Sequence, residues 1–318
     1  MEAYINMVLL TLLAIVTLTI VRQRNLFSVV VLFGVYSFLM ASVMIVLDAV
    51  DVALTEAAVG AGISTVVLIG TLHITGSEEM RPSRLALLPI VTAAATGAIL
   101  IWGTYDLPEF GKADVPINTH VAPFYLEQSI PLMGVPNVVT TILANFRSFD
   151  TLGETTVIFT AGLGIMLLLR HKSRKEASKI LKKDVVFRVI IKLIIPFIML
   201  FAFYVHFHGD YSPGGGFQAG VMLAGAVILY SIIFGAHEAQ RVVPQSVAAF
   251  MIPLGVLIYA ATGAISFIYG QNYMDYTALA SYPKDAHHLG IILIELGVLI
   301  TVASTMLSIF YAFVERRH

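Results

Sequence analysis

Long uninterrupted apolar segments constrain the fold of this 318-residue chain more than any other feature. A hydrocarbon core about 30 Å thick is crossed by roughly 20 helical residues, and a helix satisfies its own backbone hydrogen bonds, as lipid demands. The chain is 58% hydrophobic and only 12% charged, unlike soluble domains. We therefore expect an all-α, polytopic transmembrane helical bundle of about nine helices, near residues 3–21, 27–47, 52–74, 85–103, 152–170, 185–206, 214–235, 246–269 and 288–313.

The composition also argues against several classes of function. The chain has no cysteine, so it can hold no disulfide, thiolate nucleophile, iron–sulfur cluster or cysteine zinc site. A net charge of −1 and the lack of alternating basic and aromatic residues argue against nucleic-acid binding. No nucleophile–base pair or cofactor motif is visible in the sequence. We expect no cofactor, no metal site and no enzyme acting alone.

Basic residues are distributed unevenly between the two sides of the predicted bundle. If the N-terminus lies outside, the cytoplasmic side holds fourteen Lys and Arg residues, and the outer loops hold three, Lys112, Arg147 and Lys284. Cytoplasmic loops of membrane proteins carry such an excess. We predict a multi-pass protein of the cytoplasmic (inner) membrane, with its N-terminus outside and its C-terminus in the cytoplasm.

Two stretches interrupt the pattern of spans. Residues 104–151 contain five prolines, and they are predicted to form a long outer segment that is too broken to span, apart from a short interfacial helix over 137–146. Residues 171–184 form a basic amphipathic connector. This connector separates a five-helix part from a four-helix part and is the best boundary within the chain.

Ionisable side chains within the predicted spans are few, and each needs a partner, a cavity or a role in transport. Glu295 lies about two turns inside the last span without a partner nearby in sequence, and it is the strongest candidate. Glu56 lies inside the third span, whereas Asp51 at its start is expected to be an N-terminal cap. Glu154 is either a capping residue or a member of an ion path. Lys192 is either an anchor that reaches the interface or part of a proton-transfer chain.

Histidine suits a proton relay near neutral pH, because its ordinary pKa is about 6.5. His73, near the inner end of the third span, is one candidate, although we favour a hydrogen-bonding role at the interface. His206 with His208, and His287 with His288, could line an entrance at the outer ends of their helices. Neither pair has the spacing of a convincing metal site.

The most distinctive run of residues is HGDYSPGGGFQAG, over 208–220. Ser212 and Pro213 suit the N-cap and first position of the following helix, and Gly214, Gly215 and Gly216 would let the backbone approach another chain or an ion closely. The run lacks the Gly-Lys-Ser/Thr ending of a nucleotide-binding loop and follows no strand. A tight outer turn between antiparallel helices would explain the same residues.

This run, with the four spans that follow residue 185 and the Glu295 helix, resembles the B-type subunit of the Mrp-type multisubunit sodium/proton antiporters. Residues 1–80, through RQRNLFSVVVLFGVYSF and DVALTEAAVGAGIST, are similar to the D-type subunit of membrane-bound hydrogenases, which in many Mrp systems is the C-terminal part of the A-type subunit. NVVTTILANFRSFDTLGETTVIFTAGLGIMLLLR resembles the hydrogenase E-type segment. The resemblance implies three modules, a three-helix D-like module over 1–84, a two-helix E-like module with a long outer loop over 85–175, and a four-helix B-like module over 176–318.

By this resemblance the chain would be a transporter subunit that exchanges sodium for protons only within a complex. Its partners would be the large antiporter-like subunits of the A and D types, the small subunits of the C, E, F and G types, Na⁺ and H⁺. A non-conducting scaffold, or the cation-translocating module of a hydrogenase-type complex, remains the alternative. The expected ion or proton path comprises Glu56, His73, Glu154, Lys192, Asp210 and Glu295, and the expected interface motif comprises Ser212, Pro213, Gly214, Gly215, Gly216, Phe217 and Gln218.

Overall fold

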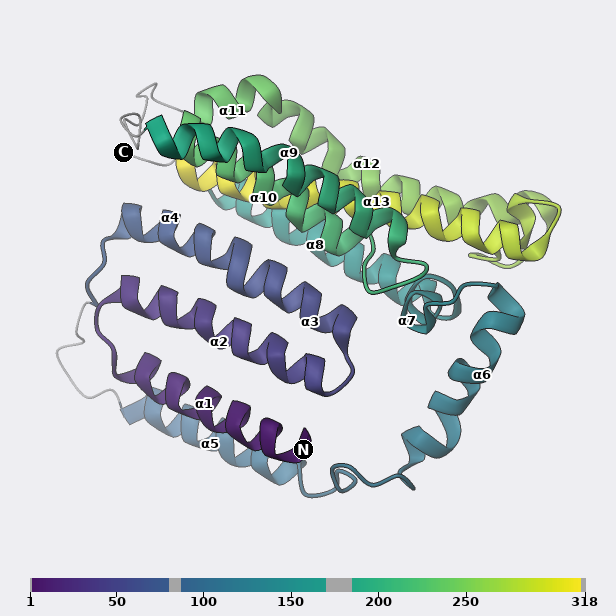
Figure 1. Cartoon of the computed structure of the whole chain (residues 1–318), viewed down its shortest axis with the longest axis horizontal. Helices are drawn as coiled ribbons and strands as arrows, with labels where there is room; N and C mark the ends of the chain where they lie inside the picture. Colours follow the sequence, from purple (N-terminus) through teal and green to yellow (C-terminus); the bar gives the residue numbers. More distant parts are fainter. Residues whose placement is uncertain (1, 80–86, 170–184, 316–318) are drawn as a thin grey trace.

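The computed structural model describes residues 2–79, 87–169 and 185–315. Within these ranges the chain is mostly helical and forms no strand (Figure 1). Eight helical segments in them are long and apolar enough to cross a membrane, which confirms the expected all-α polytopic bundle. The spanning elements are α1 (Glu2–Arg22), α2 (Leu26–Val46), α3 (Val50–Glu56) continued by η1 (Ala57–Ser64) and α4 (Thr65–Thr75), α8 (Ser148–Leu168), α9 (Val185–His208), α10 (Gly216–Phe234), α12 (Gln245–Ala264) with η4 (Ile265–Tyr269), and α13 (Pro283–Glu315).

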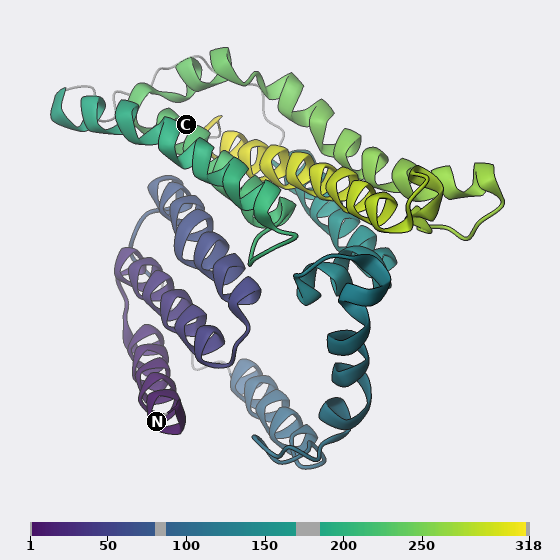
Figure 2. The same ribbon diagram turned by 45° about the vertical axis from the view of Figure 1, so that its right-hand side comes forward.

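The helices form two groups. Helices α1 to α4 lie side by side in one layer, and α8 to α13 form a bundle beside it, including the short α11 (Ala236–Val242) (Figure 1). The fourth predicted span is α5 (Leu87–Gly103), which has no buried residue and stands apart from α1 and α2 in the second view (Figure 2). The predicted basic connector, residues 171–184, lies outside the described residues.

The stretch 104–151 is more helical than its prolines predicted. It contains η2 (Ile117–Val121), α6 (Ala122–Met133), α7 (Val138–Thr141) and η3 (Ile142–Phe146). The first and second pairs meet at a bend of 83° and together could form one broken span or a re-entrant loop. Pro123 stands in the first turn of α6, where a proline disrupts little. Pro131 lies inside the helix, where it cannot donate to the carbonyl four residues earlier, and α6 ends two residues later. The expected short helix over 137–146 is present, capped by Asn137.

The bundle is organised around α13, which packs against α8, α10 and α12. Three fully buried tyrosines fix its surroundings: Tyr259 donates its hydroxyl to the carbonyl of Ser148 at 2.8 Å, and Tyr276 donates to Ala144 at 3.0 Å. Tyr311 on α13 donates to Val243 at 3.1 Å. Because a buried hydroxyl without a partner is costly, these bonds tie α13 and its neighbours to particular backbone positions. The remaining short element, η5 (Tyr276–Leu279), contacts the start of α13.

Candidate functional site

The start of α10 is the point where the glycine-rich run meets the strongest candidate carboxylate. The N–H of Gly216 donates a short hydrogen bond to Oε2 of Glu295 on α13. A Cβ atom built on Gly216 would lie 2.0 Å from the Glu295 carbonyl oxygen, so only glycine permits this approach. Gly215 before it has φ +134°, a conformation that favours glycine. The predicted close backbone approach is therefore to the helix that carries Glu295.

Three consecutive glycine amides donate to three different helices. Gly214 N–H donates to Oδ1 of Asp51 at 2.9 Å, and Gly215 N–H donates to the Val205 carbonyl on α9 at 3.2 Å. Gly216 N–H donates to Glu295. Gly215 and Gly216 are the N-cap and first residue of the following helix, whose first amides have no partner within the helix, and Gly214 precedes them. The loop between α9 and α10, residues 209–215, is called the glycine loop below. Together with Gly216 it links the α1–α4 layer, α9 and α13.

Two expectations about capping are wrong at this loop. Helix α10 begins at Gly216 with Gly215 as its N-cap, so Ser212 and Pro213 lie before the helix instead of at its first positions. Asp51 lies in the first turn of α3, whose N-cap is Ala49, and it does not cap its own helix. At α10 the carboxylates of Glu295 and Asp51 accept from Gly216 and Gly214 and take the place of a local side-chain cap. Asp51 is thereby engaged with Gly214 and makes no capping hydrogen bond to its own helix.

Asn137 holds the other side of the loop, although no sequence pattern singled it out for this role. Its side-chain amide donates to the carbonyls of Gly209 at 2.9 Å and Ser212 at 3.0 Å, and its backbone N–H donates to the Asp210 carbonyl at 2.9 Å. The Thr140 hydroxyl donates to the Gly209 carbonyl at 2.7 Å. With amides and carbonyls both bonded, the loop is held in one conformation.

Asp210 is the second ionisable residue at the loop. Its side chain is buried, and one carboxylate oxygen lies 2.5 Å from Nδ1 of His288 at the start of α13. Burial raises the pKa of Asp210 above its ordinary value, and the neighbouring His288 opposes this shift. The pair places a proton-binding carboxyl group and a titratable imidazole side by side.

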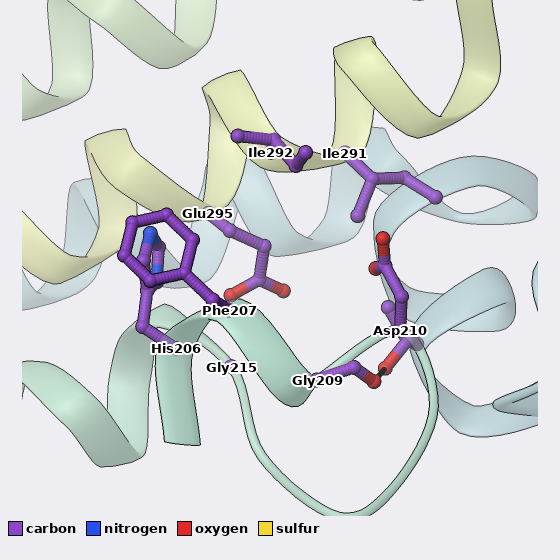
Figure 3. A pocket seen from close by; sticks show the side chains of 9 residues that line it. His206, Phe207, Gly209, Asp210, Gly215, Ile291, Ile292 and Glu295 are labelled. Carbon is purple, nitrogen blue, oxygen red and sulfur yellow. Dashed lines mark hydrogen bonds between the residues drawn. The ribbon is translucent and has the colours of Figure 1, made fainter. Parts of the chain in front are cut away.

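A small cavity lies among these groups (Figure 3). It measures about 10 Å³, close to the room that one water molecule needs. In Figure 3 the Glu295 carboxylate lies between His206 and Asp210. The lining residues are Thr140, His206, Phe207, Gly209, Asp210, Gly215, Ile291, Ile292 and Glu295.

Of the six residues expected in an ion path, the structure brings Asp210 and Glu295 together. Glu56 lies elsewhere, half-buried where α3 passes into the π-helical η1. A Cβ atom built on Gly60 would lie 2.6 Å from Oε1 of Glu56 and 2.4 Å from Oγ of Ser37, so these two side chains meet above that glycine. Glu154 is exposed on α8. His73 lies on α4, but its side chain is outside the described part of the chain.

Lys192 lies at the other end of the bundle from the loop. Its exposed side chain places Nζ 5.4 Å from the centre of the Phe234 ring, and Arg188 lies over the same ring at 5.3 Å. Phe234 is the last residue of α10, ~27 Å from Gly216 for a helix of this length. Both interpretations of Lys192 considered from sequence, an anchor and a member of a proton-transfer chain, stay predictions.

The rest of the expected interface motif is embedded in the bundle. Gln218 is buried, and Phe217 packs against the core. The residues missing from the sequence-based set are Asp51, Asn137, His206 and His288. Asp51 was interpreted as a cap and the histidines as lining an entrance, so their positions in sequence were noticed but their convergence was not.

Sequence-family comparisons divide the chain into three matches. Residues 186–308 match the domain related to the MnhB subunit of Na⁺/H⁺ antiporter. Residues 11–76 match MbhD, the D-type subunit of MBH, and residues 90–183 match MbhE, its E-type subunit.

Individual relatives agree with the first match. A protein of Staphylococcus haemolyticus described as antiporter subunit mnhB2 is 33% identical over 134 residues, 41% of this chain and 94% of that protein. The mnhB2 protein of Staphylococcus aureus strain Newman is 30% identical over 131 residues, 40% of this chain and 92% of that protein.

Two solved structures resemble the whole chain or most of it. A chain of the Mrp complex from Dietzia sp. DQ12-45-1b superposes with a TM-score of 0.70 and 26% identity, covering 94% of this chain. The present chain spans only 34% of that longer chain. A chain of the membrane-bound sulfane sulfur reductase, an archaeal respiratory membrane complex, superposes with a TM-score of 0.54 and 30% identity, covering 71% of this chain and 96% of the other.

The glycine loop and Glu295, which accepts a hydrogen bond from it, both lie within residues 186–308, the region that matches the MnhB-related domain. The mnhB2 relatives are covered almost from end to end. This multi-pass membrane protein therefore belongs to the family of MnhB-related antiporter subunits, with N-terminal segments of the MbhD and MbhE types in the same chain.

Proposed function

We propose that the chain is a membrane subunit of a multisubunit Na⁺/H⁺ antiporter and that Glu295 carries a proton or cation through it. The observation that carries this proposal is the position of the Glu295 carboxylate, on a membrane-spanning helix, in a cavity with Asp210. A carboxylate within a membrane is costly unless it has a partner or a transport role. Among the described residues Gly216 is the hydrogen-bond donor to the Glu295 side chain and it engages Oε2, which leaves Oε1 available to bind an ion.

The loop geometry supplies a way for Glu295 to alternate between charge states. When it is ionised, the Gly216 amide stabilises its negative charge, as backbone amides at helix N-termini do for anions. A proton or a sodium ion at the free oxygen neutralises that charge and weakens the attraction to the amide. Asp210 and Asp51 add negative charge at the same loop, which favours cations over anions.

The other candidates fit a path that continues into neighbouring proteins of the complex. Exposed Glu154 and the unburied surface of α5 would contact the large antiporter-like subunits of the A and D types or the small subunits of the C, E, F and G types. Glu56 and His73 would lie along the α1–α4 layer. On this proposal the protein is a transporter subunit without enzymatic activity, located in the inner membrane with an external N-terminus.

The test is sodium-dependent proton exchange in inverted vesicles that contain the complete complex. Glu295→Gln keeps the size of the side chain and an acceptor for Gly216 but cannot ionise, so exchange should be lost while the complex still assembles. Glu154→Gln, Glu56→Gln and Lys192→Ala, checked for assembly in the same way, show which other groups belong to the path. Normal exchange in assembled Glu295→Gln would leave a non-conducting scaffold as the function of this subunit.

A second candidate function is favoured by the likeness to the sulfane sulfur reductase complex. The same fold would then serve as the cation-translocating part of a redox complex. Purification of the native complex through a tag on this chain decides between the two, because large antiporter subunits indicate the antiporter, whereas iron–sulfur or nickel–iron subunits indicate a redox complex.

A further inference from the structure

His206 is a buried polar side chain that the proposed path does not use. It lies on α9, is 7% exposed and lines the cavity next to Glu295. Its Nδ1 atom has no hydrogen-bond partner among the described residues. A buried polar atom without a partner costs about 1–3 kcal/mol, and such atoms in proteins are commonly satisfied by a buried water.

The cavity has the size and the polar lining of a site for one water. Its volume of about 10 Å³ admits one such molecule. A buried water needs two to four polar partners, and the lining offers His206, Glu295 and Asp210. Phe207, Ile291 and Ile292 form the apolar part of the wall.

The three carboxylates at the loop already have partners. Asp51 accepts from Gly214, and Asp210 is paired with His288. Glu295 is held by Gly216 through one oxygen. His206 is therefore the titratable group beside the cavity that has a free ring nitrogen, and Figure 3 places it on the side of Glu295 opposite Asp210.

We propose that a single water occupies this cavity and joins Nδ1 of His206 to the Glu295 carboxylate, which makes His206 the group that exchanges a proton with Glu295. The water site follows from geometry alone, and its role in proton exchange rests on the proposed function. In the transfer, protonated Glu295 gives its proton to the water while the water gives one of its protons to Nδ1. The products are a carboxylate, an imidazolium and an unchanged water, so atoms and charge balance.

The test is infrared difference spectroscopy of the purified complete complex between a pH at which Glu295 is protonated and one at which it is ionised. The bound water is identified by an O–H stretching band that shifts in H₂¹⁸O. This band should be lost in His206→Leu, which removes one partner of the water, and in Glu295→Gln, whose side chain does not change charge between the two pH values and so gives no difference signal. His206→Asn places an amide oxygen near the position of Nδ1, so the band should be kept, whereas sodium-dependent proton exchange should be lost because asparagine cannot take up the proton.

His208→Phe is the matched control, because His208 follows on the same helix, stacks on Tyr204 and does not line the cavity. It should keep both the water band and exchange. A water band that persists in His206→Leu overturns the water site, and normal exchange in His206→Asn overturns the proton role of His206. If His206→Leu does not assemble, His206→Asn and His208→Phe still decide the question.

The two proposals fail in different ways. Normal exchange in Glu295→Gln sinks the proposed function even if the water band is present in the wild type. A wild-type spectrum without a water band sinks the present inference even if Glu295→Gln abolishes exchange.

Discussion

The α1–α4 layer and the central helices of the bundle, α10, α12 and α13, are both apolar and helical, yet the central helices bury more of their spans within the chain, whereas α8 and α9, at 11% and 17%, resemble the layer. Only 6% of the spanning window of α1 and 22% of that of α2 is buried, against 50% for α10 and 56% for α13. The bundle also has the buried tyrosine hydrogen bonds and the closest glycine contacts. Large apolar side chains are exposed on the layer, for example Tyr4 and Phe38, and on the outer helices of the bundle, for example Phe197. The difference teaches that the central helices of the bundle make most of their contacts within the chain, while the layer leaves faces for lipid or for other subunits.

The glycine loop is a strong connection between the two groups. Asp51 reaches it from the layer, and Glu295 reaches it from the bundle. Substitutions at these contacts therefore separate the effects of packing within the bundle from the effects of its connection to the layer.

The largest expected effect is at the contact between α10 and α13. Gly216→Ala places a methyl group against the Glu295 carbonyl, where an ideal Cβ lies at 2.0 Å. Backbone atoms must move, and overpacking typically costs about 1–3 kcal/mol and occasionally more. Gly225→Ala on the same helix is the control, because its nearest neighbour is Cδ1 of Ile63 at 3.8 Å. The midpoint of thermal unfolding of the purified complex should fall for Gly216→Ala alone, and equal curves for the two variants would contradict the close contact.

The next effect concerns the buried tyrosines of the bundle. Tyr259→Phe removes the hydroxyl that donates to the Ser148 carbonyl and leaves that carbonyl without its donor. The expected loss is about 1–3 kcal/mol, measured as a lower midpoint of thermal unfolding. Tyr4→Phe in the N-terminal layer should change nothing, since Tyr4 is 75% exposed. A larger shift for Tyr4→Phe would reverse the comparison between the two regions.

A smaller effect is expected at the connection between them. Asp51→Asn keeps an oxygen that can accept from Gly214 but removes the charge, and a charge-assisted hydrogen bond is roughly twice as strong as a neutral one. Hydrogen exchange should become faster in a peptide covering residues 209–216. Asp48→Asn is the control, because Asp48 is exposed and asparagine tolerates its positive φ of 58°. Unchanged exchange in Asp51→Asn would show that the layer does not hold the loop.

The smallest effect is a dependence on pH at Asp210. Because burial raises its pKa, the folded chain binds this proton more tightly than the unfolded chain does. The free energy of unfolding therefore falls as the pH rises from the ordinary value of 3.8 through the raised pKa. Asp210→Asn should flatten this part of the profile of thermal midpoint against pH. The change is small because His288 offsets part of the shift, and an identical slope in the variant would contradict the assignment.

Sequence patterns predicted the spans well because hydrophobic length is a local property. The apolar runs mark eight spanning segments and the shorter α5 with errors of a few residues at most ends. The prediction failed where proline count was taken as a measure of helix breaking. In α6 one proline stands in the first turn and the other lies inside the helix, so the number of prolines alone did not report where helices form.

The candidate site was predicted only in part. Glu295 and the glycine run were each recognised, because a lone carboxylate in a span and a Gly-Gly-Gly run are visible in one segment. Asn137 is 72 residues away in sequence from Gly209, to which it donates, and Asp51 is 163 residues away from Gly214. His206 is 89 residues away from Glu295. No local pattern reports such distances.

By itself the sequence determined that the chain crosses the membrane as helices, because lipid accepts only segments that satisfy their own backbone. It also placed a glycine at position 216, and a residue without a Cβ atom there lets α10 approach α13 closely. Only the tertiary structure decided which carboxylates accept hydrogen bonds from the glycine amides before and at the start of α10, and which histidine lines the cavity. The physical reason is that hydrogen bonds act over about 3 Å in space, whereas their partners here are brought together by the packing of helices far apart in the chain.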